Sequence, residues 1–164
     1  MDASFVGLRG SPELERVIQR IELTPLAIVD AAARPKVPTM TGASQHGEVA
    51  VFYYDDNASA EPTGFWVLGK RTTRVSIHRP NADKPLLLQV HSGLIANRLH
   101  LSVGGWNHTM DLKPELPQRL EVPSSNQRLV TLELMTENAF VPMEMDSASR
   151  DERPLGAWVE VVYP

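Results

Sequence analysis

The sequence contains no cysteine among its 164 residues. This absence excludes disulfide bridges, thiolate nucleophiles and cysteine-ligated zinc, and it is compatible with either a reducing or an oxidising compartment. No apolar run approaches the ~20 residues of a membrane-spanning helix, and the first residues lack the basic and apolar segments of a signal peptide. We therefore expect a soluble chain without protein-based redox chemistry.

An excess of positive charge is also missing. Lysine and arginine number 16 against 20 aspartates and glutamates, which gives a formal net charge of -4. Proteins that hold nucleic acids or anionic membranes usually carry a basic surface. The composition therefore predicts no nucleic-acid partner, and the length predicts one core-forming domain.

Motifs that identify enzymes are absent as well. The sequence has no G-x-S-x-G elbow, no P-loop and no glycine-rich phosphate cradle after a strand. Carboxylate pairs of the kind that glycosidases use can be assembled from its Asp and Glu residues, but their separation in space is not visible in a sequence. We expect a protein that is not an enzyme, and a small sandwich hydrolase is the weaker alternative.

The first part of the chain predicts a helix over residues 11–22. Ser11 is a good N-cap and Pro12 suits the first helical position. An apolar stripe at helical spacing follows, made by Leu14, Val17, Ile18 and Ile21. A proline-rich connection comes next, so we expect residues 1–46 to form an N-terminal extension packed on the main domain.

From residue 48 the hydrophobic period changes from that of a helix to that of a strand. We expect strands at 48–54, 64–68, 73–79, 86–91, 97–103, 106–111, 119–122, 128–135 and 156–163. Gly104 and Gly105 predict a two-residue hairpin between two of them. The interpretation is an all-β protein with a short N-terminal helix, in which residues 47–164 form an antiparallel β-sandwich, most simply a jelly roll of eight or nine strands.

The segment 55–61 combines several side-chain oxygens on one predicted loop. Asp55, Asp56, Asn57 and Glu61 are residue types that bind Ca²⁺, which takes six to eight oxygen ligands at ~2.3 to 2.6 Å. Asp and Asn also build ordinary turns between strands. A calcium site and a structural turn are both open interpretations.

A charged loop, residues 140–158, lies between two apolar segments. Arg153 can offer a bidentate guanidinium to a carboxylate or to sugar hydroxyls, while Asp151 and Arg153 can equally form an internal ion pair that fixes the loop. The loop is therefore either part of a ligand site or a structural clamp.

Among the aromatic residues, Trp106 is the best candidate for a sugar-stacking surface. It follows the predicted turn and precedes Asn107 and His108, whereas Trp66 and Trp158 lie in apolar runs typical of a core. We therefore expect Trp106, Asn107, His108 and Arg153 to contact a ligand.

The histidines offer a further site. By strand alternation, His78, His91 and His100 oppose the apolar residues of their strands, so they can share one polar sheet face, with His46 outside the sheet. Converging imidazoles bind zinc, but the spacing equally fits a solvated face.

Two pairs of segments carry a resemblance to a known group of proteins. Residues 53–57 with 61–67, and 140–142 with 147–159, resemble soluble β-sandwich modules at the C-terminal ends of large bacterial membrane proteins, including glycosyltransferase-like ones. The resemblance covers roughly residues 48–163 and implies a galactose-binding-like jelly roll, often carbohydrate-binding and sometimes stabilised by Ca²⁺.

The resemblance also bears on function and location. It implies a glycan or polysaccharide as ligand, a membrane-embedded parent chain as partner, and a place outside the cytoplasmic membrane if the chain is a fragment; otherwise we expect a cytoplasmic protein. Our hypothesis is a non-catalytic carbohydrate-binding or cell-envelope accessory module, and the alternative is a structural or protein-docking domain.

Overall fold

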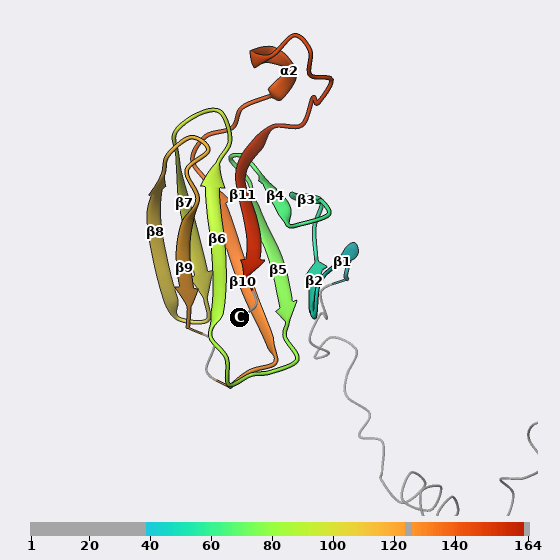
Figure 1. The fold of residues 1–164 in the computed structure, drawn as a ribbon, viewed down its shortest axis with the longest axis vertical. Coiled ribbons are helices and arrows are strands. Elements are labelled where there is room, and N and C mark those ends of the chain that lie inside the picture. The colour runs from blue at the N-terminus through green and yellow to red at the C-terminus, as the bar shows by residue number, and fades with distance from the viewer. Residues whose placement is uncertain (1–38, 124–125, 163–164) are drawn as a thin grey trace, which may run out of the picture. The chain divides into compact units, whose positions relative to one another are not determined.

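A computed structural model describes residues 39–123 and 126–162. The predicted helix over residues 11–22 and most of the expected extension lie outside these residues. The described part contains two antiparallel sheets that face each other (Figure 1). The six-stranded sheet has the order β1 (Gly42–His46), β2 (Val49–Tyr53), β5 (Thr72–His78), β10 (Leu129–Thr136), β7 (Asn97–Val103) and β8 (Trp106–Leu112). The five-stranded sheet has the order β3 (Ala58–Ala60), β4 (Phe65–Leu68), β11 (Leu155–Val162), β6 (Leu86–Ser92) and β9 (Gln118–Val122).

The predicted all-β sandwich is confirmed. All nine expected strands are present, each with bounds within one residue of the prediction. Alternate residues of each sheet point inward and are fully buried, as Val75 and Ile77 are on β5 and Leu132 and Leu134 are on β10. The remaining residues of each strand therefore point outward, to the face of the sheet that lies away from the core.

The strand count is higher than predicted, because β1 and β3 were not expected. Gly47, with φ of 61°, and Glu48 form a two-residue turn that pairs His46 with Val49. Glycine in the first central position of such a turn accepts the positive φ at little cost. The sandwich therefore begins at Gly42 rather than after residue 46, and His46 lies in the sheet instead of outside it.

The last two strands occupy central positions. Strand β10 lies between β5 and β7, and β11 lies between β4 and β6. The predicted hairpin at Gly104 and Gly105 is confirmed, since Val103 pairs with Trp106 and Gly104 has a φ of 57°. This hairpin makes β8 an edge strand of the six-stranded sheet.

The segment between β10 and β11 leaves the sandwich as a closed loop. Phe140 and Leu155 exchange two backbone hydrogen bonds of 2.8 Å at its base, and both side chains are buried. The short helix α2 (Pro142–Met145), which the sequence did not predict, lies at the far end of the loop (Figure 1). Within residues 39–123 and 126–162, no helix is long and apolar enough to cross a membrane.

Candidate functional site

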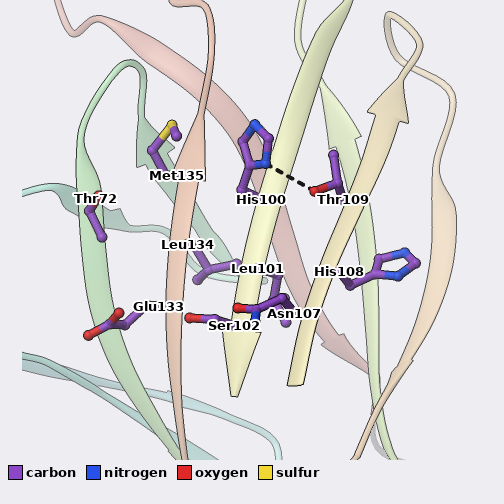
Figure 2. A pocket seen from close by; sticks show the side chains of 10 residues that line it. All are labelled: Thr72, His100, Leu101, Ser102, Asn107, His108, Thr109, Glu133, Leu134 and Met135. Atoms are coloured by element: carbon purple, nitrogen blue, oxygen red, sulfur yellow. Dashed lines mark hydrogen bonds between the residues drawn. The ribbon is translucent and has the colours of Figure 1, made fainter. Parts of the chain in front are cut away.

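The outer face of the six-stranded sheet carries a polar depression. Three hollows of about 250, 340 and 260 Å³ adjoin one another there and share the side chain of Glu133. We call them together the outer groove, and its lining includes Tyr54, Asp55, Thr72, Arg74, His100, Ser102, Asn107, Thr109, Thr131, Glu133 and Met135. Figure 2 shows the hollow over β10, β7 and β8.

A single row of side chains crosses the groove perpendicular to the strands. The sheet register places Arg74 opposite Glu133, Glu133 opposite Ser102, and Ser102 opposite Asn107. The row continues to Tyr54, which directly follows β2, because the backbone N–H of Tyr54 donates a hydrogen bond to the carbonyl of Arg74. Because neighbouring strands lie ~4.8 Å apart, the four paired residues span about 14 Å.

The Glu133 side chain is held in position by Arg74. Its Oε1 accepts hydrogen bonds from Arg74 Nε at 3.1 Å and from Arg74 Nη2 at 2.5 Å. The hydrogen bond and charge of Glu133 raise the pKa of Arg74 above its ordinary value. Among the described residues, Glu133 Oε2, Ser102 Oγ and the Asn107 amide make no hydrogen bond. The row therefore presents three polar groups with unused hydrogen-bonding capacity.

A second row borders the first and consists of Thr72, Met135, His100 and Thr109. His100 Nδ1 lies 3.0 Å from Thr109 Oγ1, and His100 Nε2 lies 3.0 Å from Glu137 Oε1. Since a carboxylate only accepts hydrogen bonds, Nε2 carries the proton that is donated to Glu137. The imidazole is thus fixed at the wall of the groove.

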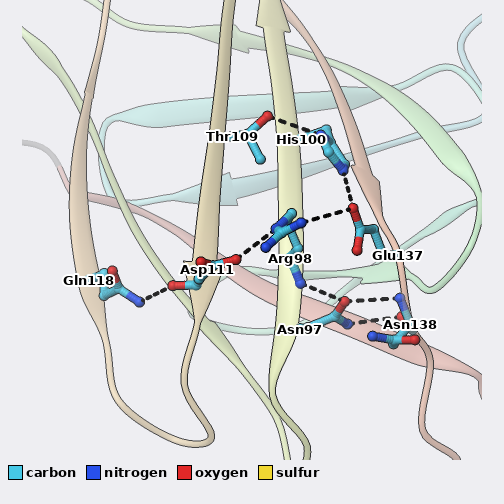
Figure 3. A network of polar contacts seen from close by, with 8 residues as sticks. All are labelled: Asn97, Arg98, His100, Thr109, Asp111, Gln118, Glu137 and Asn138. Atoms are coloured by element: carbon cyan, nitrogen blue, oxygen red, sulfur yellow. Dashed lines mark hydrogen bonds and ion pairs between the residues drawn. The ribbon is translucent and has the colours of Figure 1, made fainter.

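Figure 3 shows how this histidine joins a wider network at the same end of β7 and β8. Arg98 Nε donates to Asp111 Oδ1 at 2.7 Å, and Arg98 Nη1 lies 3.8 Å from Glu137 Oε1. The hydrogen bond from Arg98 to Asp111 raises the pKa of the guanidinium. Arg98 is therefore paired with two carboxylates.

The four residues predicted to contact a ligand do not form one site. Asn107 lies in the outer groove, where Figure 2 shows it beside Ser102, while the His108 side chain is on the other side of β8. The Trp106 ring is half-buried, packs against the core and stacks on the His108 ring at 5.4 Å and an interplanar angle of 2°. Trp106 is therefore not the open stacking surface that its place beside the turn suggested.

Arg153 lies elsewhere, at the base of the loop 140–155. Its guanidinium donates to both carboxylate oxygens of Asp151, at 2.9 and 2.7 Å, to Glu61 Oε1 at 2.9 Å and to Ser59 Oγ at 2.5 Å. The hydrogen bond from Arg153 lowers the pKa of Asp151, and the same bond raises the pKa of Arg153. Four of the five N–H donors of Arg153 are used, so the contacts favour the clamp interpretation of this loop.

The residues predicted as calcium ligands also turn toward separate partners. Asp55 Oδ1 accepts from the backbone N–H of Asn57 and from Thr73 Oγ1, and Asp55 Oδ2 accepts from the backbone N–H of Arg74. The Glu61 carboxylate faces Arg153, and the side chain of Asp56 is exposed. In the part of the chain that the structure describes, no three His, Asp or Glu side chains gather as metal ligands do.

Two further predictions were wrong. Trp66 and Trp158 are not in the core: they lie half-buried on the outer face of the five-stranded sheet, with ring centroids 5.4 Å apart. His91 lies beside them, 6.1 Å from Trp66, so it cannot share a sheet face with His78 and His100, which belong to the other sheet.

The sequence interpretation missed Arg74 and Glu133 as site residues. A signal for Arg74 and Glu133 was present, since each alternates with buried residues of its strand and so points outward. Nothing in the sequence indicates that the two lie opposite each other, 59 positions apart in the chain.

Comparisons with known proteins add no identification. No family model matches this chain, and no curated protein or solved structure shows significant similarity to it. The geometry of the outer groove is therefore the basis for inferring what this protein binds.

Proposed function

We propose that this protein is a non-catalytic carbohydrate-binding module that holds a glycan in the outer groove. The observation that supports the proposal is the row formed by Glu133, Ser102 and Asn107, whose unused polar groups lie side by side over about 10 Å of sheet. Sugar hydroxyls both donate and accept hydrogen bonds, so such a row suits them.

The surroundings of the row support the same ligand class. Tyr54 and Met135 add half-buried apolar surface beside the polar side chains of the lining. Sugars combine hydroxyls with apolar ring faces, which aromatic side chains contact favourably. Because the side chains stand on paired strands rather than on loops, the site is held rigid, which reduces the entropy cost of binding.

Binding can be tested with a glycan array, followed by affinity gel electrophoresis on each polysaccharide that the array identifies. The substitution Ser102→Trp fills the hollow between Glu133 and Asn107 without touching the core, so it should abolish retention. Gln89→Trp is the matched control, because Gln89 lies on the outer face of the other sheet. The control should bind like the wild type.

The same experiment separates this proposal from a purely structural or protein-docking domain. A docking domain would show no retention on any glycan, and Ser102→Trp would change nothing. Retention that survives Ser102→Trp but is lost in Gln89→Trp would move the site to the sheet that carries Trp66 and Trp158, and would refute the outer groove as the binding surface.

A further inference from the structure

We infer that the outer groove selects neutral glycans and rejects acidic ones. This inference rests on the proposed function and goes beyond it by naming the ligand class. It follows from how the charged side chains of the groove are paired.

Arg74 is the only arginine or lysine among the described residues that line the groove, and it is ion-paired with Glu133. Arg74 uses both Nε and Nη2 on Glu133 Oε1. Asp55, the other charged residue there apart from the histidines, accepts three hydrogen bonds from its own neighbourhood. One guanidinium and two carboxylates leave the lining with a formal charge of -1 when the histidines are neutral.

The free atom at the centre of the groove is an anionic acceptor. Because Arg74 occupies Oε1, Oε2 of Glu133 is the carboxylate oxygen that stays available to a ligand, and Glu133 stands between Arg74 and Ser102 in the row. A sugar hydroxyl can donate to this oxygen, and charge-assisted hydrogen bonds of this kind are stronger than neutral ones. A uronic acid carboxylate or a sulfate cannot donate, and it would meet a like charge.

The hollow lined by Arg98, Asp111, Lys113 and Glu137, at the other end of β7 and β8, carries balanced formal charge. Arg98 lies there between Asp111 and Glu137, and it donates to the first at 2.7 Å (Figure 3). Since Lys113 makes no ion pair among the described residues, this hollow does not itself discriminate against acidic chains, and the selection is a property of the outer groove. The net charge of -4 on the whole chain acts in the same direction.

The test uses affinity gels that contain either a neutral polysaccharide (xyloglucan, laminarin or mannan) or an acidic one (polygalacturonate or alginate). The wild-type protein should be retarded by at least one neutral polymer and by neither acidic one. Retardation should change little between about 0.05 and 0.5 M salt, because no net ion pairing with the ligand is involved.

The variant Glu133→Gln isolates the role of the pairing. It frees Arg74 and removes the anionic acceptor, so neutral binding should weaken by about tenfold. The variant should also gain retardation on polygalacturonate that disappears at high salt. Glu121→Gln, on the outer face of the five-stranded sheet, changes the net charge equally and should behave like the wild type.

The possible failures are distinguishable. Retention on no glycan of either kind would refute the proposed function together with this inference. Wild-type retention on the acidic polymers would refute the inference alone, and so would a Glu133→Gln variant that gains no acidic binding.

Discussion

Gly93 provides a direct test of how the loop 140–155 is attached to the sandwich. A Cβ atom built on Gly93 would overlap Cζ and Cε1 of the Phe140 ring, which is 7% exposed. The φ of Gly93 is outside the left-handed region, so alanine is compatible with the backbone there. The substitution Gly93→Ala therefore perturbs one contact, the packing of the Phe140 ring on the sheet.

The expected loss in the free energy of unfolding follows from the packing that the Phe140 ring gives up. Burying a phenylalanine side chain contributes about 1.5 to 3 kcal/mol, and forced repacking of a core costs a similar amount. We expect Gly93→Ala to lower the free energy of unfolding by about 2 kcal/mol, and Phe140→Ala to lower it by about 3 kcal/mol. In the double variant the new methyl group occupies space that the ring has left, so the loss should stay near 3 kcal/mol.

Urea denaturation of the four proteins, followed by tryptophan fluorescence, measures these losses. Trp66 lies 5.9 Å from Phe140 and reports on the site. A double-mutant cycle with a coupling of about 2 kcal/mol would confirm the packing. Additive losses, or a Gly93→Ala variant as stable as the wild type, would refute the reasoning.

Three further predictions concern local interactions. Asp151→Asn should remove about 1 kcal/mol of stability at neutral pH, since its partner Arg153 is partly exposed. Because the folded pKa of Asp151 is lowered, this contribution exists above the unfolded pKa and is lost as pH falls through the folded value, so the wild type and the variant should converge in urea titrations below about pH 4. Gly104→Ala should cost about 1 to 2 kcal/mol because φ is 57°, whereas Gly105→Ala, with open space and no positive φ, should cost a few tenths; thermal melts compare the two. A metal chelator should leave the melting temperature unchanged, because Asp55 is occupied by protein donors, and a rise on adding Ca²⁺ would contradict this.

The strand positions were predictable because alternation and turn residues are local properties. The segment 97–103 alternates clearly between apolar and polar residues, and its bounds were predicted without error. The strands that were missed lack that signal: β1 reads Gly-Ala-Ser-Gln-His and β3 reads Ala-Ser-Ala. Small and polar residues at a sheet edge need no apolar face, so pairing with a neighbour rather than burial places them in the sheet.

The prediction that Trp66 and Trp158 lie in the core was wrong for a related reason. Trp66 lies between Phe65 and Val67, and Trp158 lies between Ala157 and Val159, so the runs are apolar on both faces and hide the alternation. Those four neighbours point into the core and are fully buried, which leaves the tryptophans outside. Only the register of β4 and β11 shows that the two rings meet.

The candidate site was the least predictable part. That Glu133 and Ser102 point outward follows from alternation, but their adjacency depends on β10 inserting beside β7, and the sequence does not indicate this. Asn107 was selected because it follows Trp106 in the sequence, and the structure places the two side chains on opposite faces of β8. Pairing between distant segments, rather than local pattern, creates the groove.

The central positions of β10 and β11 have a consequence for how the protein folds during synthesis. Until residues 129–162 have been made, the other strands can form only separate groups, with β5, β7, β4 and β6 each exposing an unpaired edge. Unpaired edges are where chains aggregate, and pairing over long sequence separations is slow. The nascent chain is therefore most prone to aggregation until β10 and β11 have left the ribosome. A stop codon shortly before β10 should yield a product that aggregates rather than a smaller folded domain.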